Sequence, residues 1–228
     1  MKLDLHVHCL PVSCCARFQA EEVPGRLKAA GVDGFCLCNH YYPGHLSQIG
    51  RELPEQIEAF IACFQKCREA AEALGMTVLF GAEVKLIQLP SHPEFLLYGL
   101  TPEILRQALP LYNYTQEQLY EFCQSESILM YQAHPYRTEQ GYAPADPTYM
   151  DGIEVYNGHA IFDPKYEKTL EFARTHRLAM SAGSDFHDPE DAGRGGIIVP
   201  DDVRITNSLE LRDYLKGNRE PELYEKAL

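Results

Sequence analysis

The chain has 228 residues, of which 45% are hydrophobic and 23% charged, an ordinary composition for a globular protein. A chain of this length buries roughly three-quarters of its unfolded surface, so we expect one domain over residues 1–228. The 33 acidic and 20 basic residues give a net charge of -13, which repels a long nucleic acid but leaves a small phosphorylated partner open, because that partner needs only local positive charge.

Short apolar runs alternate with longer amphipathic ones, the pattern of strands connected by helices. Strands are predicted, in chain order, at Leu3–Val7, Gly34–Asn39, Val78–Val84, Phe95–Gly99, Leu129–Ala133, Gly152–Tyr156 and Ala179–Ala182. Helices are predicted at Glu21–Ala30, Pro54–Leu74, Pro102–Ala108, Gln116–Glu126 and Pro164–His176. This alternation favours a parallel α/β architecture, either a barrel or a barrel with one irregular side.

Helix starts and loops complete this prediction. Thr101 before Pro102 and Thr115 before Gln118 have the spacing of helix N-caps. Thr138–Met150 and Asp188–Gly196 are rich in turn-forming residues and are predicted to be loops. Both follow strand ends that carry histidine, which is where ligands bind in parallel α/β folds.

Histidines and acids gather at the predicted strand ends. His6 and His8 point to one side of the first strand because a strand alternates its faces, and Asp185 with His187 repeats the spacing. The other strand-end candidates are His40, Glu83, His134 and Glu94. Each triplet alone is equally consistent with histidines that bind nothing, but together they indicate a metal site. We expect His45, His92 and His176 at the surface.

With these motifs in this order, the sequence resembles the polymerase and histidinol phosphatase (PHP) family. The similarity covers nearly the whole chain, from DLHVH through Asn39–His40, Glu83, AHP, EVYNG and GSDFH to GRGG. The resemblance implies a distorted (β/α)7 barrel with two or three divalent metal ions, zinc, iron or manganese, at its C-terminal face.

The resemblance also implies a ligand set. His6, His8, Glu83 and Asp185 would hold one metal, and His40 with His187 a second. Glu83 would extend to a third with His134 and Glu94, where the family often has histidine. A solvent-facing edge position is the other interpretation of Glu94.

Two positions depart from the family pattern. Cys14 occupies the place of a further ligand to the second metal, and a thiolate there would favour zinc or iron; packing of Cys14 and Cys15 as small side chains remains equally open. Asn39 replaces the usual aspartate, which is expected to remove an acceptor near the ligands or a hydrogen bond to one of them, and so to tune the site without abolishing it. The pairs Cys36 with Cys38 and Cys63 with Cys67 are expected in the core.

The expected chemistry is hydrolysis of a small phosphomonoester or nucleotide-type phosphate ester, by attack of a hydroxide shared between the metals. Arg137 and Arg194 are candidate phosphate clamps, because both lie in loops after strands that carry ligands, and surface salt bridges are the alternative. His159 is a candidate proton donor to the leaving group, or a loop histidine bonded to backbone. Tyr41 and Tyr42 could flank the substrate or cover the core.

Two other functions stay open. Amidohydrolases also begin with His-X-His on a barrel, although Glu83 here takes the place of their bridging lysine. A non-catalytic module that binds metal or phosphate is the second alternative, if the changes at Cys14 and Asn39 disable the site.

The expected compartment is the cytoplasm. The N-terminal MKLDLHVH has no apolar stretch like that of a signal peptide, and eight cysteines in a chain of this length do not indicate a disulfide scaffold. No run approaches the ~20 apolar residues that cross a bilayer, so no membrane association is expected. The sequence leaves the oligomeric state open.

Overall fold

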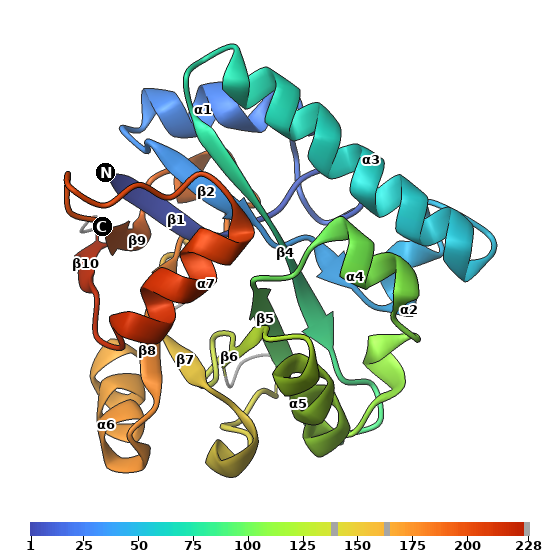
Figure 1. Cartoon of the computed structure of the whole chain (residues 1–228), viewed down its shortest axis with the longest axis vertical. Helices are drawn as coiled ribbons and strands as arrows, with labels where there is room; N and C mark the ends of the chain where they lie inside the picture. The colour runs from blue at the N-terminus through green and yellow to red at the C-terminus, as the bar shows by residue number, and fades with distance from the viewer. Residues whose placement is uncertain (138–140, 162–164, 226–228) are drawn as a thin grey trace.

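A strongly curved mixed sheet organises the chain, described here from a computed structural model that covers residues 1–137, 141–161 and 165–225 (Figure 1). Within those residues the strands are β1 (Lys2–Val7), β2 (Gly34–Leu37), β3 (His40–Tyr41), β4 (Thr77–Lys85), β5 (Glu94–Tyr98), β6 (Leu129–Gln132), β7 (Gly152–Asn157), β8 (Ala179–Gly183), β9 (Gly195–Ile198) and β10 (Glu222–Glu225). The helices are α1 (Val23–Ala29), α2 (Pro43–Leu46), α3 (Leu53–Glu72), α4 (Pro102–Gln107), α5 (Gln116–Ser125), α6 (Tyr166–His176) and α7 (Ser208–Gly217).

The strand order is β10-β9-β1-β2-β4-β5-β6-β7-β8, with β3 paired to β4. β1, β2 and β4 run parallel, as do β6, β7 and β8. β5 is antiparallel to both of its neighbours. The sequence therefore predicted the strands but not this reversal, and a strict sevenfold βα repeat is not what the chain forms.

β8, at one end of the sheet, returns to lie beside β1. The backbone amide of His8 donates to the carbonyl of Phe186 at 3.1 Å, and the amide of Phe186 donates to the carbonyl of His6 at 3.2 Å. At Gly183 a Cβ atom would lie 2.3 Å from the Cβ of His6, so only glycine permits this approach. The result is a nearly closed barrel.

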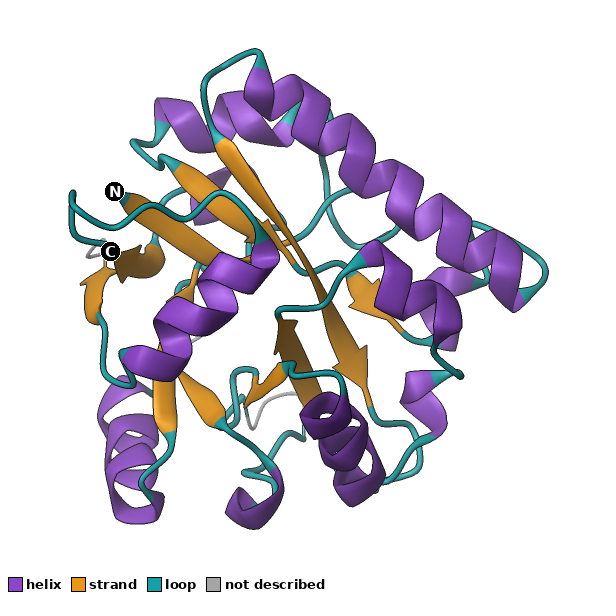
Figure 2. Cartoon of the chain, viewed as in Figure 1, coloured by secondary structure: helices purple, strands orange, loops and turns teal. Residues whose placement is uncertain are grey.

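Helices cover the outside of the sheet (Figure 2). α3 packs against β4 and α6 against β7, while α7 crosses β4 and β5. The apolar face of α3 contributes Ile57, Phe60, Ile61 and Phe64 to the larger of two hydrophobic clusters.

The predicted helix starts are confirmed. The Thr101 hydroxyl accepts from the backbone of Ile104, and Thr115 with Gln118 forms a complete capping box. Pro164, the predicted start of the next helix, lies outside the described residues, and α6 is seen from Tyr166.

Five of the helices and strands named above were not predicted. α7, β9 and β10 follow the last predicted strand, β3 follows the predicted second strand, and the short α2 follows β3. β9 begins at Gly195, so the predicted loop Asp188–Gly196 ends slightly earlier than expected. The predicted second strand, Gly34–Asn39, stops at Leu37, and His40 instead pairs with Glu83 in β3. Residues 138–140 of the predicted loop Thr138–Met150 are outside the described residues.

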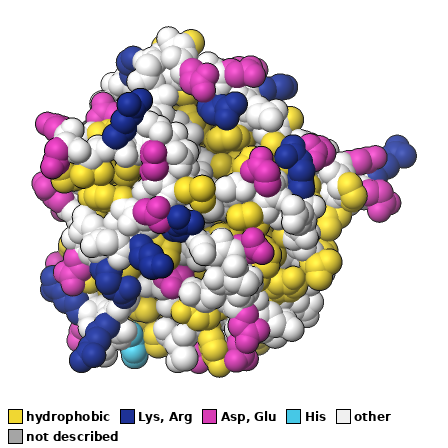
Figure 3. Space-filling view, in the orientation of Figure 1, with side chains coloured by type: hydrophobic (Ala, Val, Ile, Leu, Met, Phe, Trp, Pro, Cys, Tyr) yellow, Lys and Arg dark blue, Asp and Glu magenta, His cyan; other side chains and the backbone are white. Residues whose placement is uncertain are grey.

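On the face seen in Figure 3, acidic and basic side chains are interspersed and hardly any histidine shows. His6, His8, His40, His134 and His187 are all buried. No helix in the described part of the chain combines the length and apolarity needed to span a membrane.

Candidate metal centre

β1 delivers two imidazoles to one buried space. His6 and His8 alternate with Leu5 and Val7, so both project to the same side of the strand, and neither is accessible to solvent. Asp185 follows β8, and its Oδ1 lies 3.2 Å from His8 Nε2 and 3.5 Å from His6 Nε2. The predicted convergence of these two strand ends is therefore present.

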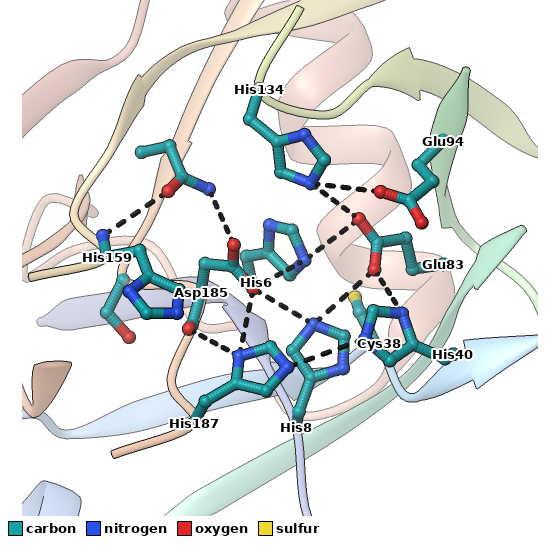
Figure 4. A network of polar contacts seen from close by, with 12 residues as sticks. His6, His8, Cys38, His40, Glu83, Glu94, His134, His159, Asp185 and His187 are labelled. Carbon is teal, nitrogen blue, oxygen red and sulfur yellow. Dashed lines mark hydrogen bonds and ion pairs between the residues drawn. The ribbon is translucent and has the colours of Figure 1, made fainter. Parts of the chain in front are cut away.

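Glu83, near the end of β4, lies at the middle of the site. Its Oε1 is 3.0 Å from His134 Nε2 and 3.3 Å from His6 Nε2. Its Oε2 is 2.7 Å from His40 Nδ1 and 3.6 Å from His8 Nε2. One carboxylate thus faces four imidazoles, as Figure 4 shows.

A sulfur and several nitrogens form one side of the site. His8, His40 and His187 have ring nitrogens close enough to share an ion, and His40 Nε2 lies 3.4 Å from His187 Nε2. Cys15, not Cys14, joins this side, in a group with His40 and His45. The Cys14 side chain is exposed, and its Sγ lies 3.4 Å from His45 Nδ1.

Carboxylates form the other side. His134, after β6, has its Nε2 3.4 Å from Glu94 Oε2 and 3.0 Å from Glu83 Oε1. Glu94 is buried rather than facing solvent, so the edge interpretation of this residue is wrong. Because β5 is antiparallel, the first residue of that strand reaches the edge where the parallel strands end.

Hydrogen bonds at the back of the rings turn the Nε2 atoms inward. His6 Nδ1 lies 2.9 Å from Glu154 Oε1, and His187 Nδ1 lies 2.8 Å from the carbonyl of Asp185. Both acceptors require a proton on Nδ1, which leaves the Nε2 lone pair for a metal. Glu154 was not predicted, although an acid inside the apolar strand GIEVYN was a visible signal.

Asn39 acts on His8 through Ser13. The Ser13 hydroxyl donates to Asn39 Oδ1 at 2.8 Å, so His8 Nδ1 donates to the Ser13 Oγ at 3.1 Å. This chain fixes His8 with its Nε2 lone pair toward the centre. Asn39 thus still supplies an acceptor behind a candidate ligand, through Ser13.

The buried donor atoms fit a cation. His6 Nε2, His8 Nε2, His40 Nδ1 and Glu83 Oε2 make no hydrogen bond within the described structure, even though His40 and Glu83 are only 2.7 Å apart. Buried polar atoms almost always have a hydrogen-bond partner. Several such atoms that lie close together without hydrogen-bond geometry therefore fit a cation bound between them. The mixture of imidazole, carboxylate and thiol suits zinc, iron or manganese.

Charge inside the site is strongly coupled. Burial alone would lower the pKa of His6, but the carboxylates of Asp185, Glu154 and Glu83 raise it well above its ordinary value. Burial, helped by the charges of His40 and His187, lowers the pKa of His8 well below its usual range. The carboxylates thus favour positive charge at this site. The lowered pKa of His8 favours its neutral form, which is the form of a histidine that binds a metal.

Cys15 is an exposed cysteine whose thiol differs chemically from an ordinary one. Burial would raise its pKa, but hydrogen bonds from His187 and His40 lower the pKa of Cys15 to about 6. The thiolate is the form that binds a metal.

Two ligand positions have a left-handed backbone. His134 has φ of 27° and Asp185 has φ of 52°, a region that non-glycine residues seldom occupy. Such strain is tolerated where the surroundings fix the residue, and it often accompanies functional sites.

A pocket of about 500 Å³ opens over the centre. Arg137 lines it, and its Nη2 donates to Asp185 Oδ2 and Asn157 Oδ1, each at 2.6 Å. His159 lines it too, with its ring 5.5 Å from that of His187. Arg194 is not among the described residues that line the pocket; it packs against Gly158.

One histidine lies differently from what the sequence indicated, and the two tyrosines divide between the two roles that the sequence left open. His45, expected at the surface, is buried, and its Nδ1 accepts from the backbone amide of Cys14. Tyr41 packs in the core, with its ring 5.9 Å from that of Phe60, whereas Tyr42 lines the pocket. His92 is exposed as expected.

Comparisons with known proteins identify the fold. No family model and no curated protein matches the chain. Among solved structures, a two-domain protein from Bacteroides vulgatus containing a predicted PHP-like metal-dependent phosphoesterase is similar over 96% of this chain and 63% of its own, with 19% identity and a TM-score of 0.67. The chain adopts a PHP-like barrel.

Two other structures share this fold. The lesion-specific endonuclease EndoQ from Pyrococcus furiosus is similar over 97% of this chain and 57% of its own, at 16% identity and a TM-score of 0.60. An amidohydrolase from Chromobacterium violaceum, with bound sulfate, is similar over 88% of this chain and 93% of its own, at 18% identity and a TM-score of 0.54. The chain thus spans less than two-thirds of two of these proteins.

Proposed function

We propose that this chain is a metal-dependent phosphoesterase of the PHP type that hydrolyses a small phosphorylated substrate. The observation that carries the proposal is the position of Glu83, whose two oxygens face separate groups of imidazoles. A carboxylate placed in this way can join neighbouring ions.

Three groups of residues would hold the ions. His6, His8 and Asp185 form the first, His40, His187 and Cys15 the second, and Glu83, His134 and Glu94 the third. Two or three divalent ions there, zinc, iron or manganese, would polarise a phosphoryl group and make a water acidic enough to attack at neutral pH.

Protein residues would supply orientation and a proton. Arg137 holds Asp185 in place and has its guanidinium at the pocket, where its positive charge would favour a phosphoryl group at the metals. His159 lies over His187 and is the candidate donor to the leaving oxygen. Since Arg194 lies away from the pocket lining, we do not propose it as a clamp.

The test combines metal analysis with a substrate panel. Protein purified without chelator should contain about two or three divalent ions per chain by elemental mass spectrometry. After removal of these ions, manganese, zinc or iron should restore hydrolysis of phenyl phosphate, with lactones and amides left intact. Fewer than two ions and no hydrolysis would favour a non-catalytic module, and cleavage of the amides or lactones alone would favour an amidohydrolase.

A further inference from the structure

Lys85 is a cation at the wall of the pocket, and it is not one of the proposed metal ligands. It ends β4 and lies opposite Glu94 in the antiparallel register with β5. Directly opposed residues share a face, and Lys85 is two residues beyond Glu83, so all three side chains project to the same side. The Lys85 side chain is 21% exposed, so the pocket reaches it.

Two polar groups and two rings surround the ammonium. Lys85 Nζ lies 3.2 Å from Glu94 Oε1 and 3.0 Å from the Tyr142 hydroxyl. It also lies 5.1 Å from the centre of the Tyr42 ring and 5.3 Å from that of Tyr142. An ammonium has three donors, so the two polar partners found in the described residues leave one for a ligand. The rings keep the ammonium in place over their faces.

Lys85 lies close to the metal centre. Glu94 contacts Lys85 through one oxygen and faces His134 through the other. Only the width of one carboxylate therefore separates Lys85 from the third group of metal donors. A molecule with its phosphoryl group at the metals can reach Lys85 with a neighbouring substituent.

Among the described residues that line the pocket, the other arginine or lysine is Arg137, which faces the metal centre. Arg137 Nη2 is bonded to Asp185 and Asn157, and the chain as a whole carries a net charge of -13. An anionic substituent away from the metals therefore needs a local cation, and Lys85 is placed to be that cation.

We propose that Lys85, held by Tyr42 and Tyr142, binds a second anionic group of the substrate, a phosphate or a carboxylate, beside the phosphoryl group that is hydrolysed. This inference rests on the proposed phosphoesterase function. It makes Lys85 a specificity-determining residue and predicts that doubly anionic phosphate esters are preferred.

The test compares three esters of one carbon length with the metal-loaded protein: propyl phosphate, 3-phosphooxypropanoate and propane-1,3-diol bisphosphate. The wild-type chain should prefer one or both doubly anionic esters in kcat/KM, on the order of 10- to 100-fold, which is the effect of a charge-assisted hydrogen bond. Comparison of kcat/KM for the two doubly anionic esters then shows whether the second anionic group is a carboxylate or a phosphate.

Lys85→Met keeps the alkyl stem and should remove this preference with little effect on propyl phosphate. Lys85→Arg should retain it in part, and Lys66→Met, on the exposed side of α3, should behave as the wild-type chain. An equal loss on all three esters would overturn the inference, because it would mean that Lys85 only positions Glu94. A wild-type chain without the preference would overturn it as well, independently of whether any variant folds.

Failure of the proposed function gives a different result. If no phosphate ester is hydrolysed, that function is wrong. The Lys85 subsite is then tested by binding measurements alone. Calorimetry should show that propane-1,3-bisphosphonate binds the wild-type chain more tightly than propylphosphonate does, and that Lys85→Met removes the difference. Equal binding of both phosphonates would overturn the subsite.

Discussion

The two sides of the site offer different donor atoms. One side, formed by His8, His40, His187 and Cys15, presents nitrogen and sulfur, and the other, formed by Glu83, Glu94 and His134, presents mainly oxygen. Nitrogen and sulfur suit zinc and iron, whereas oxygen suits harder ions such as manganese. The difference indicates that the positions need not hold the same metal, although Glu83 touches both sides.

The largest effect is expected at Glu83 because it belongs to both sides. Glu83→Gln keeps the size of the side chain but removes its charge, so kcat/KM for a phosphate ester should fall by at least about 10³-fold, or roughly 4 kcal/mol. Elemental analysis should show metal lost from both sides. A variant that loses only one ion would mean that Glu83 belongs to one side alone.

The second prediction tests whether His159 donates a proton to the leaving group. If it donates a proton there, His159→Gln should slow phenyl phosphate hydrolysis by about 10²-fold, while 4-nitrophenyl phosphate, whose leaving group needs little protonation, should be affected much less. Equal losses on the two esters would exclude this role for His159.

Glu94 tests the oxygen side alone. Glu94→Gln should weaken the third position and lower activity by about 10- to 100-fold, while zinc held by the nitrogen and sulfur side stays bound. The measurement is metal content beside kcat/KM. Unchanged metal content with reduced activity would show that Glu94 orients other groups and does not hold an ion.

Cys15 tests the sulfur side with a control at the next residue. Cys15→Ser should lower zinc affinity by about tenfold and shift the preference toward manganese. Cys14→Ser should change neither property, because Cys14, which is exposed as Cys15 is, lies outside the donor groups of the described residues. A cobalt–thiolate charge-transfer absorption that persists in cobalt-substituted Cys15→Ser would contradict this assignment.

The sequence predicted the strands and most strand-end residues because both depend on local pattern. His6 and His8 share a face for the same reason that any strand alternates, and the Thr115 capping box follows from spacing alone. The direction of β5 was not predictable in this way, since an alternating strand reads the same in either direction.

Residues outside regular strands were harder to place. Cys14 and Cys15 differ by one position in a loop, where neither a period of 2 nor one of 3.6 fixes the direction of a side chain. The structure places the sulfur of Cys15 in a group with His40 and His45. His45 and Tyr142 reach the site from outside the strands, His45 beside His40 and Tyr142 beside His134. Lys85 was missed because its role depends on its cross-strand neighbour Glu94.

The reversed strand also creates a hairpin whose tip lies at the rim of the pocket. Lys85 and Glu94 are its last paired residues, and residues 86–93 connect them without belonging to the barrel wall. Hairpin tips accept insertions and sequence changes more readily than the strands that carry them. New substrate preferences could therefore be engineered by grafting segments between Lys85 and Glu94, while β1, β4 and β8 keep the catalytic scaffold unchanged.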